Sequence, residues 1–76
     1  MGAITVYSKP NCGGCVLVKS WLQDNGKEFK EIDVTKNKGA LKYIKEKGFK
    51  GLPVVEQGSL MFSGYNEDKL LDLMGK

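Results

Sequence analysis

An α/β fold, with a four-stranded mixed sheet and three helices, is predicted by three observations on this sequence. Short apolar runs of β type alternate with segments whose apolar residues recur at helical spacing, in the order β-α-β-α-β-β-α. The chain has 76 residues, which is enough for one domain and not for two, so we expect residues 1–76 to form a single domain. With 41% apolar and 28% charged residues, the composition is that of an ordinary globular protein.

The first three predicted elements are a strand, a helix and a second strand. Residues 3–7 form an apolar run that suits a central strand covered on both faces. The apolar residues at helical spacing between positions 12 and 25 are Leu17, Val18, Trp21 and Leu22. Gly26 ends this helix, and the alternation over 28–34 predicts the second strand. A right-handed crossover through the helix makes the two strands parallel neighbours.

The second half of the chain predicts a helix, a hairpin and a last helix. Residues 38–47 form the helix, with either Asn37 or Thr35 as its cap. Its inward residues are Leu41, Tyr43 and Ile44. Two short runs, 54–56 and 60–62, form the hairpin. The last helix begins after a cap at Asn66 and carries Leu70, Leu71, Leu73 and Met74. This element order is the thioredoxin-like arrangement in its smallest form.

Charge and hydropathy exclude several classes of protein. The net charge of +3 comes from twelve lysines and nine acidic residues, without arginine. Base and phosphate recognition favour the planar fork of arginine, so we expect no nucleic-acid partner, although a basic face that docks an acidic protein stays open. The longest apolar runs have about five residues, far fewer than the roughly 20 of a membrane span. Lys9 follows the first run too closely for a signal peptide, and we expect a cytoplasmic monomer.

Two cysteines, Cys12 and Cys15, are the candidates for the chemistry, because the chain has no other cysteine and no histidine. At a helix start, N–H groups without partners and the helix dipole stabilise a thiolate. We expect Asn11 to be the N-cap and Cys12 to be the attacking thiolate, with Lys9 adding a positive charge nearby. Cys15 lies one turn into the helix, so we expect it to be more buried and to keep its proton until it reacts.

Gly13 and Gly14 separate the two cysteines. Each glycine costs roughly 1 kcal/mol relative to alanine inside a helix, which a purely structural segment does not favour. Glycine leaves room for the backbone of a partner to approach. Two alternatives stay open: buried cysteines that act as small apolar residues, and carriage of a metal or iron–sulfur cluster. A structural zinc site normally takes four ligands where this chain offers two, so we expect no resident metal.

Pro53 marks a second candidate segment, directly before a predicted strand. Only about 5–6% of such peptide bonds are cis in folded proteins, but in a thioredoxin-like fold a cis-proline faces the cysteine pair. The backbone of Leu52 is then free to pair with an incoming peptide, which binds as an additional strand. Tyr7 suits the core and a place beside the thiols equally well. A candidate rim for partners, where the last strand meets the last helix, consists of Ser63, Gly64 and Tyr65.

These residues together resemble the glutaredoxins and, within them, the NrdH-type redoxins. The resemblance lies in residues 4–12 with Cys15, in 48–49 with 52–55, and in 63–65. It implies a dithiol–disulfide oxidoreductase without a bound cofactor, in which the redox-active disulfide is Cys12–Cys15. Ribonucleotide reductase is implied as the electron acceptor and a flavin-dependent thioredoxin reductase as the donor, with glutathione as the alternative donor. The implied substrate-binding residues are Lys9, Gly13, Gly14, Leu52, Pro53, Ser63, Gly64 and Tyr65.

The chain departs from the ordinary glutaredoxin pattern at three places. Glycines replace the Pro-Tyr pair between the cysteines, Gly51-Leu52 replaces Thr-Val before Pro53, and 63–66 replaces the Gly-Gly-Asp turn that holds glutathione. Phe62 stands where NrdH-type redoxins usually have tryptophan. The departures from the glutaredoxin pattern favour a protein disulfide over glutathione as the substrate.

Overall fold

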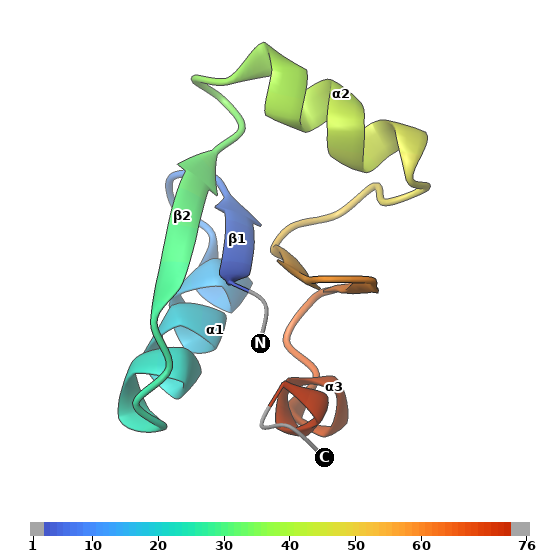
Figure 1. Ribbon diagram of the computed structural model, residues 1–76. Coiled ribbons are helices and arrows are strands. Elements are labelled where there is room, and N and C mark those ends of the chain that lie inside the picture. Colours follow the sequence, from blue (N-terminus) through green and yellow to red (C-terminus); the bar gives the residue numbers. More distant parts are fainter. Residues whose placement is uncertain (1–2, 74–76) are drawn as a thin grey trace.

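The computed structural model describes residues 3–73 and has the predicted order of elements (Figure 1). In chain order the elements are β1 (Ile4–Ser8), α1 (Gly13–Asp24), β2 (Phe29–Asp33), α2 (Lys38–Glu46), β3 (Val54–Gln57), β4 (Leu60–Ser63) and α3 (Glu67–Asp72). The predicted thioredoxin-like order β-α-β-α-β-β-α is therefore confirmed. Met74, which we predicted in the last helix, lies outside the described residues.

The four strands form one mixed sheet in the order β2-β1-β3-β4. β1 and β2 are parallel, as the crossover through α1 requires, and β3 is antiparallel to both β1 and β4. Val6 of β1 and Val54 and Val55 of β3 are fully buried, so both central strands are covered on both faces. Because β1 is central, the loop that follows it leaves the sheet between its neighbours β2 and β3 and leads directly into α1.

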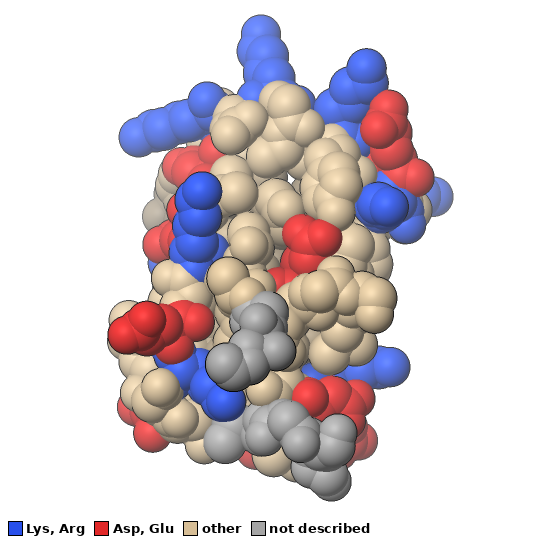
Figure 2. Space-filling view, viewed as in Figure 1, with Lys and Arg blue, Asp and Glu red and all other residues tan. Residues whose placement is uncertain are grey.

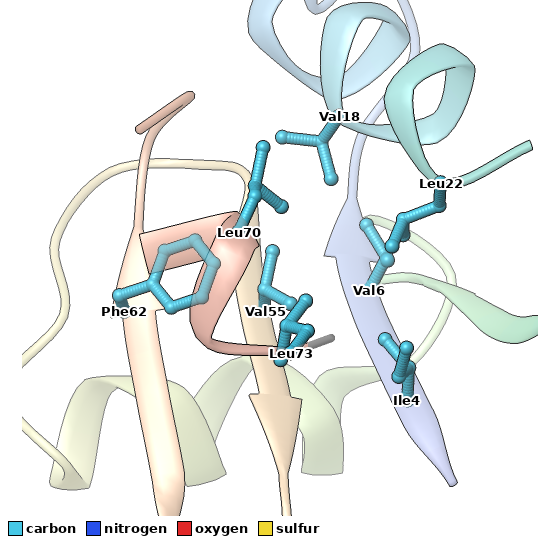
Figure 3. Close-up of a cluster of buried hydrophobic side chains, with 8 residues drawn as sticks. All are labelled: Ile4, Val6, Val18, Leu22, Val55, Phe62, Leu70 and Leu73. Atoms are coloured by element: carbon cyan, nitrogen blue, oxygen red, sulfur yellow. The ribbon is translucent and has the colours of Figure 1, made fainter. Parts of the chain in front are cut away.

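Two clusters of apolar side chains pack on the two faces of the sheet. The cluster between the sheet, α1 and α3 is shown in Figure 3 and consists of Ile4, Val6, Val18, Leu22, Val55, Phe62, Leu70 and Leu73. The cluster beneath α2 has as its buried members Tyr7, Val34, Ile44 and Val54. Successive side chains of a strand point to opposite faces, which explains why neighbours in sequence such as Val54 and Val55 belong to different clusters.

The apolar stripe of α1 is narrower than its sequence predicts. The helix buries Cys15, Val18 and Leu22, whereas the side chain of Leu17 is 54% exposed, so the inward place predicted for Leu17 is wrong. Positions 15, 18 and 22 follow the spacing of one helix face, and Leu17 lies off that face. Trp21 is half-buried and packs against the cluster of Figure 3.

Tyr7 belongs to the core. Its side chain is 6% exposed, and its hydroxyl donates a hydrogen bond to Oε1 of Glu56 at 2.9 Å. The hydroxyl of Tyr43, on α2, donates to the other oxygen of the same carboxylate at 2.5 Å. Burial and the adjacent Glu56 carboxylate raise the pKa of Tyr7.

Between residues 3 and 73, none of the helices combines the length and apolarity that crossing a membrane requires.

Candidate active site

Cys12 itself is the N-cap of α1. Its backbone is extended, and its sulfur accepts a hydrogen bond from the backbone N–H of Cys15 at 3.3 Å. The prediction that Asn11 is the N-cap is wrong: Asn11 has a φ of 60°, the left-handed region that asparagine tolerates better than most residues, and turns the chain into the helix. The sulfur of Cys12 therefore takes the capping position, where free N–H groups and the helix dipole favour negative charge.

Cys15 lies beneath Cys12 and is closed to solvent. Its side chain is 1% exposed, Cys12 is half-buried, and both are free thiols. Burial, together with a hydrogen bond to Cys12, raises the pKa of Cys15 to about 11, while the backbone N–H of Lys9 acts in the opposite direction. At neutral pH the buried thiol thus keeps its proton, and the sulfur that a partner can reach is that of Cys12.

This raised pKa predicts a pH dependence of stability in the reduced protein. The pKa of Cys15 is about 11 in the folded chain against an ordinary value of 9.0, so the stabilisation is complete below about pH 9 and is lost as the pH rises towards 11. We expect the free energy of unfolding, measured by urea titration of reduced protein, to fall more steeply across this range in the wild type than in Cys15→Ser. Parallel pH profiles for the two proteins would contradict the assignment.

The segment at Pro53 lies directly against the start of α1. The Leu52–Pro53 peptide bond is cis, and Pro53 is buried. A Cβ atom added at Gly14 would lie 3.2 Å from Cδ of Pro53, so glycine is what allows this approach. On its other side, the carbonyl of Pro53 accepts a hydrogen bond from the N–H of Gly64 at 2.7 Å. Three segments far apart in the sequence are therefore in contact around the cysteine pair.

The remaining predicted binding residues line this site in different ways. Leu52 is half-buried in the cluster beneath α2, which holds the backbone before Pro53 in place. Ser63 ends β4 and is exposed, and the side chain of Tyr65 is 43% exposed, so both remain available to a partner. Lys9 has an exposed side chain, and its contact with the cysteine pair is made by its backbone.

The two glycines between the cysteines predict opposite responses to alanine. A Cβ atom at Gly13 meets nothing within 4 Å, so Gly13→Ala should raise the free energy of unfolding by roughly 0.4–1 kcal/mol through the lower entropy of the unfolded chain. In Gly14→Ala the methyl group presses on the buried ring of Pro53, and we expect this variant to be less stable than the wild type. Urea titration of the three proteins measures both effects. Equal stabilisation by both substitutions would contradict this prediction, because it would show that the Pro53 segment moves away from the added methyl group at no cost in stability.

Sequence reasoning missed a polar network beside the cysteines. Ser8 is 2% exposed, and its hydroxyl donates to Oε2 of Glu31 at 2.7 Å. The ammonium of Lys19 pairs with the same oxygen at 2.8 Å, and these two donors, Lys19 first, lower the pKa of Glu31. Lys19 lies one helical turn after Cys15, and its charge favours the Cys15 thiolate. The spacing of four residues between Cys15 and Lys19, which places both on one face of the helix, was the sequence signal that could have revealed this contact.

Across residues 3–73, no group of three or more histidine, cysteine, aspartate or glutamate side chains is arranged to hold a metal ion.

Comparisons with known proteins agree on one family. The family model named Glutaredoxin matches residues 4–60. The glutaredoxin-like protein NrdH of Lactococcus lactis subsp. cremoris is 36% identical over 70 residues, covering 92% of this chain and 97% of that protein. The glutaredoxin-like protein NrdH of Escherichia coli K12 is 33% identical over 67 residues, covering 88% of this chain and 83% of that protein.

Solved structures of redoxins share the whole architecture. The NrdH-redoxin of Escherichia coli, described as a glutaredoxin-like protein with a thioredoxin-like activity profile, has a TM-score of 0.91 at 32% identity, covering 93% of each chain. A glutaredoxin from Archaeoglobus fulgidus has a TM-score of 0.80 at 28% identity, covering 100% of this chain and 89% of that one.

Proposed function

Since this chain belongs to the glutaredoxin family and is a thiol–disulfide oxidoreductase of the NrdH type, we propose that it is a dithiol electron donor to a protein disulfide. One observation carries this proposal: the partly accessible sulfur of Cys12 caps α1, with the buried thiol of Cys15 beneath it. A sulfur in this position is reachable by a partner and is held within one helical turn of a second thiol that can displace that partner.

The first step is attack by the Cys12 thiolate on one sulfur of the partner's disulfide. The partner's S–S bond breaks, a Cys12–partner disulfide forms, and the second sulfur of the partner leaves as a thiolate that takes up a proton. We propose that the backbone at Leu52 and the exposed side chain of Tyr65 orient the incoming chain. The backbone of Leu52 pairs with the backbone of the partner, which lies beside it like an additional strand. The ring of Tyr65 supplies an exposed apolar contact.

The second step is attack by Cys15 on the sulfur of Cys12. Cys15 first loses its proton, and the charge of Lys19 and the N–H of Lys9 favour the thiolate that results. The Cys12–partner bond then breaks, the Cys12–Cys15 disulfide forms, and the partner's sulfur that Cys12 had attacked leaves as a thiolate and takes up a proton in place of the one that Cys15 lost, so both sulfurs of the partner are now reduced. Two electrons pass from this dithiol to the partner, and the chemistry uses the redox-active disulfide without a bound cofactor.

For the partners, we propose ribonucleotide reductase as the acceptor and a flavin-dependent thioredoxin reductase as the donor. The likeness to NrdH proteins supports both, and so do the departures at 63–65 from the turn that holds glutathione. We place the reaction in the cytoplasm, where thiols are kept reduced.

Recycling of the oxidised protein tests this proposal directly. Oxidised protein is offered NADPH with thioredoxin reductase or, in parallel, NADPH with glutathione and glutathione reductase, and consumption of NADPH is followed. We expect reduction by the first system and little by the second. Reduction by the glutathione system alone would make the chain a glutathione-dependent glutaredoxin. A stoichiometric metal or a coloured cluster after aerobic purification would support the metal-carrier alternative instead.

A further inference from the structure

Positive charge is concentrated in one short segment of the chain. Residues 36–50, which comprise α2 and its flanks, contain six lysines and one acidic residue, Glu46. The rest of the chain has six lysines and eight acidic residues, so it is slightly negative and the whole net charge of +3 originates in this segment. Such an asymmetric distribution creates a directed field rather than a uniformly basic surface.

Three of these six lysines, Lys38, Lys42 and Lys45, belong to α2, and the other three flank it. All six are exposed, and the salt bridge Lys19–Glu31 is the one found among residues 3–73, so none of the six pairs with a described acidic side chain within 4.0 Å. Figure 2 shows lysine side chains extending from the end of the molecule where α2 lies in Figure 1. The Nζ atom of Lys47 lies 5.6 Å from the centre of the Tyr43 ring. The other five lysines have exposed side chains.

A shallow groove with an apolar floor runs along the same helix. It is lined by Lys38, Leu41, Lys42, Lys45 and Glu46. Lys38, Lys42 and Lys45 recur at helical spacing on one face, and their aliphatic stems border the half-buried Leu41. A ligand seated there meets the apolar surface of Leu41 next to the side chains of three lysines and of Glu46. This chemistry suits a peptide with an apolar residue between acidic ones better than it suits a nucleic acid, which arginine and stacking aromatics recognise.

The groove and the segment at which a disulfide substrate arrives are linked through one apolar cluster. Leu41 and Leu52 belong to the same apolar cluster beneath α2, and Leu52 precedes the cis-proline that faces the cysteine pair. Lys50 is three residues before Pro53, so their Cα atoms are at most about 11 Å apart. A protein whose disulfide contacts Cys12 therefore lies close to Lys50, at one end of the basic segment 36–50.

We propose that the groove of α2 docks an acidic segment of the protein whose disulfide this chain reduces. The segment carries aspartate or glutamate on both sides of an apolar residue that rests on Leu41. This inference rests on the proposed function for the disulfide, and it adds a second contact that selects the partner and speeds encounter with it.

The test compares two synthetic peptides that share one disulfide ring. One carries a tail with a leucine flanked by aspartates, and in the other serines replace the aspartates. Pre-reduced protein is mixed with each, and the second-order rate constant of reduction is measured. At low salt we expect about a tenfold preference for the acidic tail, which should fall below about twofold at 0.5 M NaCl, where the Debye length is about 4 Å.

Matched variants assign this preference to the groove. Lys38→Glu with Lys42→Glu should abolish it, whereas Lys30→Glu with Lys69→Glu, an equal change of charge at exposed lysines outside the segment, should retain most of it. A preference that both double variants lose equally would reflect net charge and overturn the proposal, as would the absence of any preference for the acidic tail. Failure to reduce either peptide would count against the proposed function instead.

A binding measurement that needs no redox chemistry completes the test. The acidic tail alone, without cysteines, is titrated into ¹⁵N-labelled protein, and we expect amide shift changes concentrated in 38–46 of the wild type and absent from Lys38→Glu with Lys42→Glu. Shift changes elsewhere would overturn the proposal. Tighter binding of a single-stranded DNA or an anionic vesicle to the same residues would overturn it too, since the groove would then be a general polyanion site.

Discussion

Replacing Cys12 with serine is expected to lower the rate of disulfide reduction by at least about a thousandfold, since a hydroxyl at this position is a far weaker nucleophile than a thiolate. Cys15→Ser should behave differently. The first attack on the partner remains, but the second thiol is missing, so the Cys12–partner disulfide accumulates. The measurement is the rate of reduction of a peptide disulfide, combined with intact mass spectrometry of the products under non-reducing conditions.

The two variants control for one another, because each removes one sulfur from the same short segment. We expect a covalent complex with the partner in Cys15→Ser and none in Cys12→Ser. Full disulfide-reducing activity in Cys12→Ser would refute the mechanism. A complex trapped by Cys12→Ser rather than by Cys15→Ser would reverse the roles of the two cysteines, in spite of the burial of Cys15.

Truncation of Leu70 to alanine is the substitution outside the site that we expect to destabilise the fold most. The side chain of Leu70 is completely buried and joins α3 to the cluster of Figure 3. Leu→Ala at such a site typically costs about 2–5 kcal/mol, a large part of the stability of a small domain. Urea titration, with the slope of the transition compared as well as its midpoint, measures this loss.

Leu71→Ala is the matched control, because it changes the same residue type one position further along the same short helix. The side chain of Leu71 is 46% exposed, and we expect a loss of no more than about 0.5–1 kcal/mol. Similar losses for the two variants would mean that helix propensity, rather than burial in the cluster, governs the contribution of α3.

Local pattern was sufficient to predict the order of elements. The run around Val6 could be recognised as a strand because strands covered on both faces are largely apolar, and the two runs on either side of Gly58 could be recognised as a hairpin. Residue type left Asn37 and Thr35 as possible caps of α2, and the side chain of Asn37 is the one that accepts the N–H of Ala40. The stripe of α1 was harder to read, since Leu17 is apolar yet exposed, and only the packing partners decide which apolar residues face inward.

The candidate site shows the same division between local and distant information. Cys12, Cys15 and Pro53 stood out because their types and neighbours are unusual. The hydrogen bond from Ser8 to Glu31 joins residues 23 positions apart, and nothing in either local sequence indicates that they meet. The contact between Gly14 and Pro53 likewise depends on how α1 is placed against β3.

The capping of α1 by a reactive sulfur couples its redox chemistry to the order of the helix start. In the reduced protein the N–H of Cys15 donates to the Cys12 sulfur. Once that sulfur enters a disulfide it can no longer form a thiolate and is a much poorer acceptor, so this amide is released towards water. The exchange rate of a single backbone proton with deuterium therefore becomes an internal reporter of oxidation state, readable without a label or a substrate.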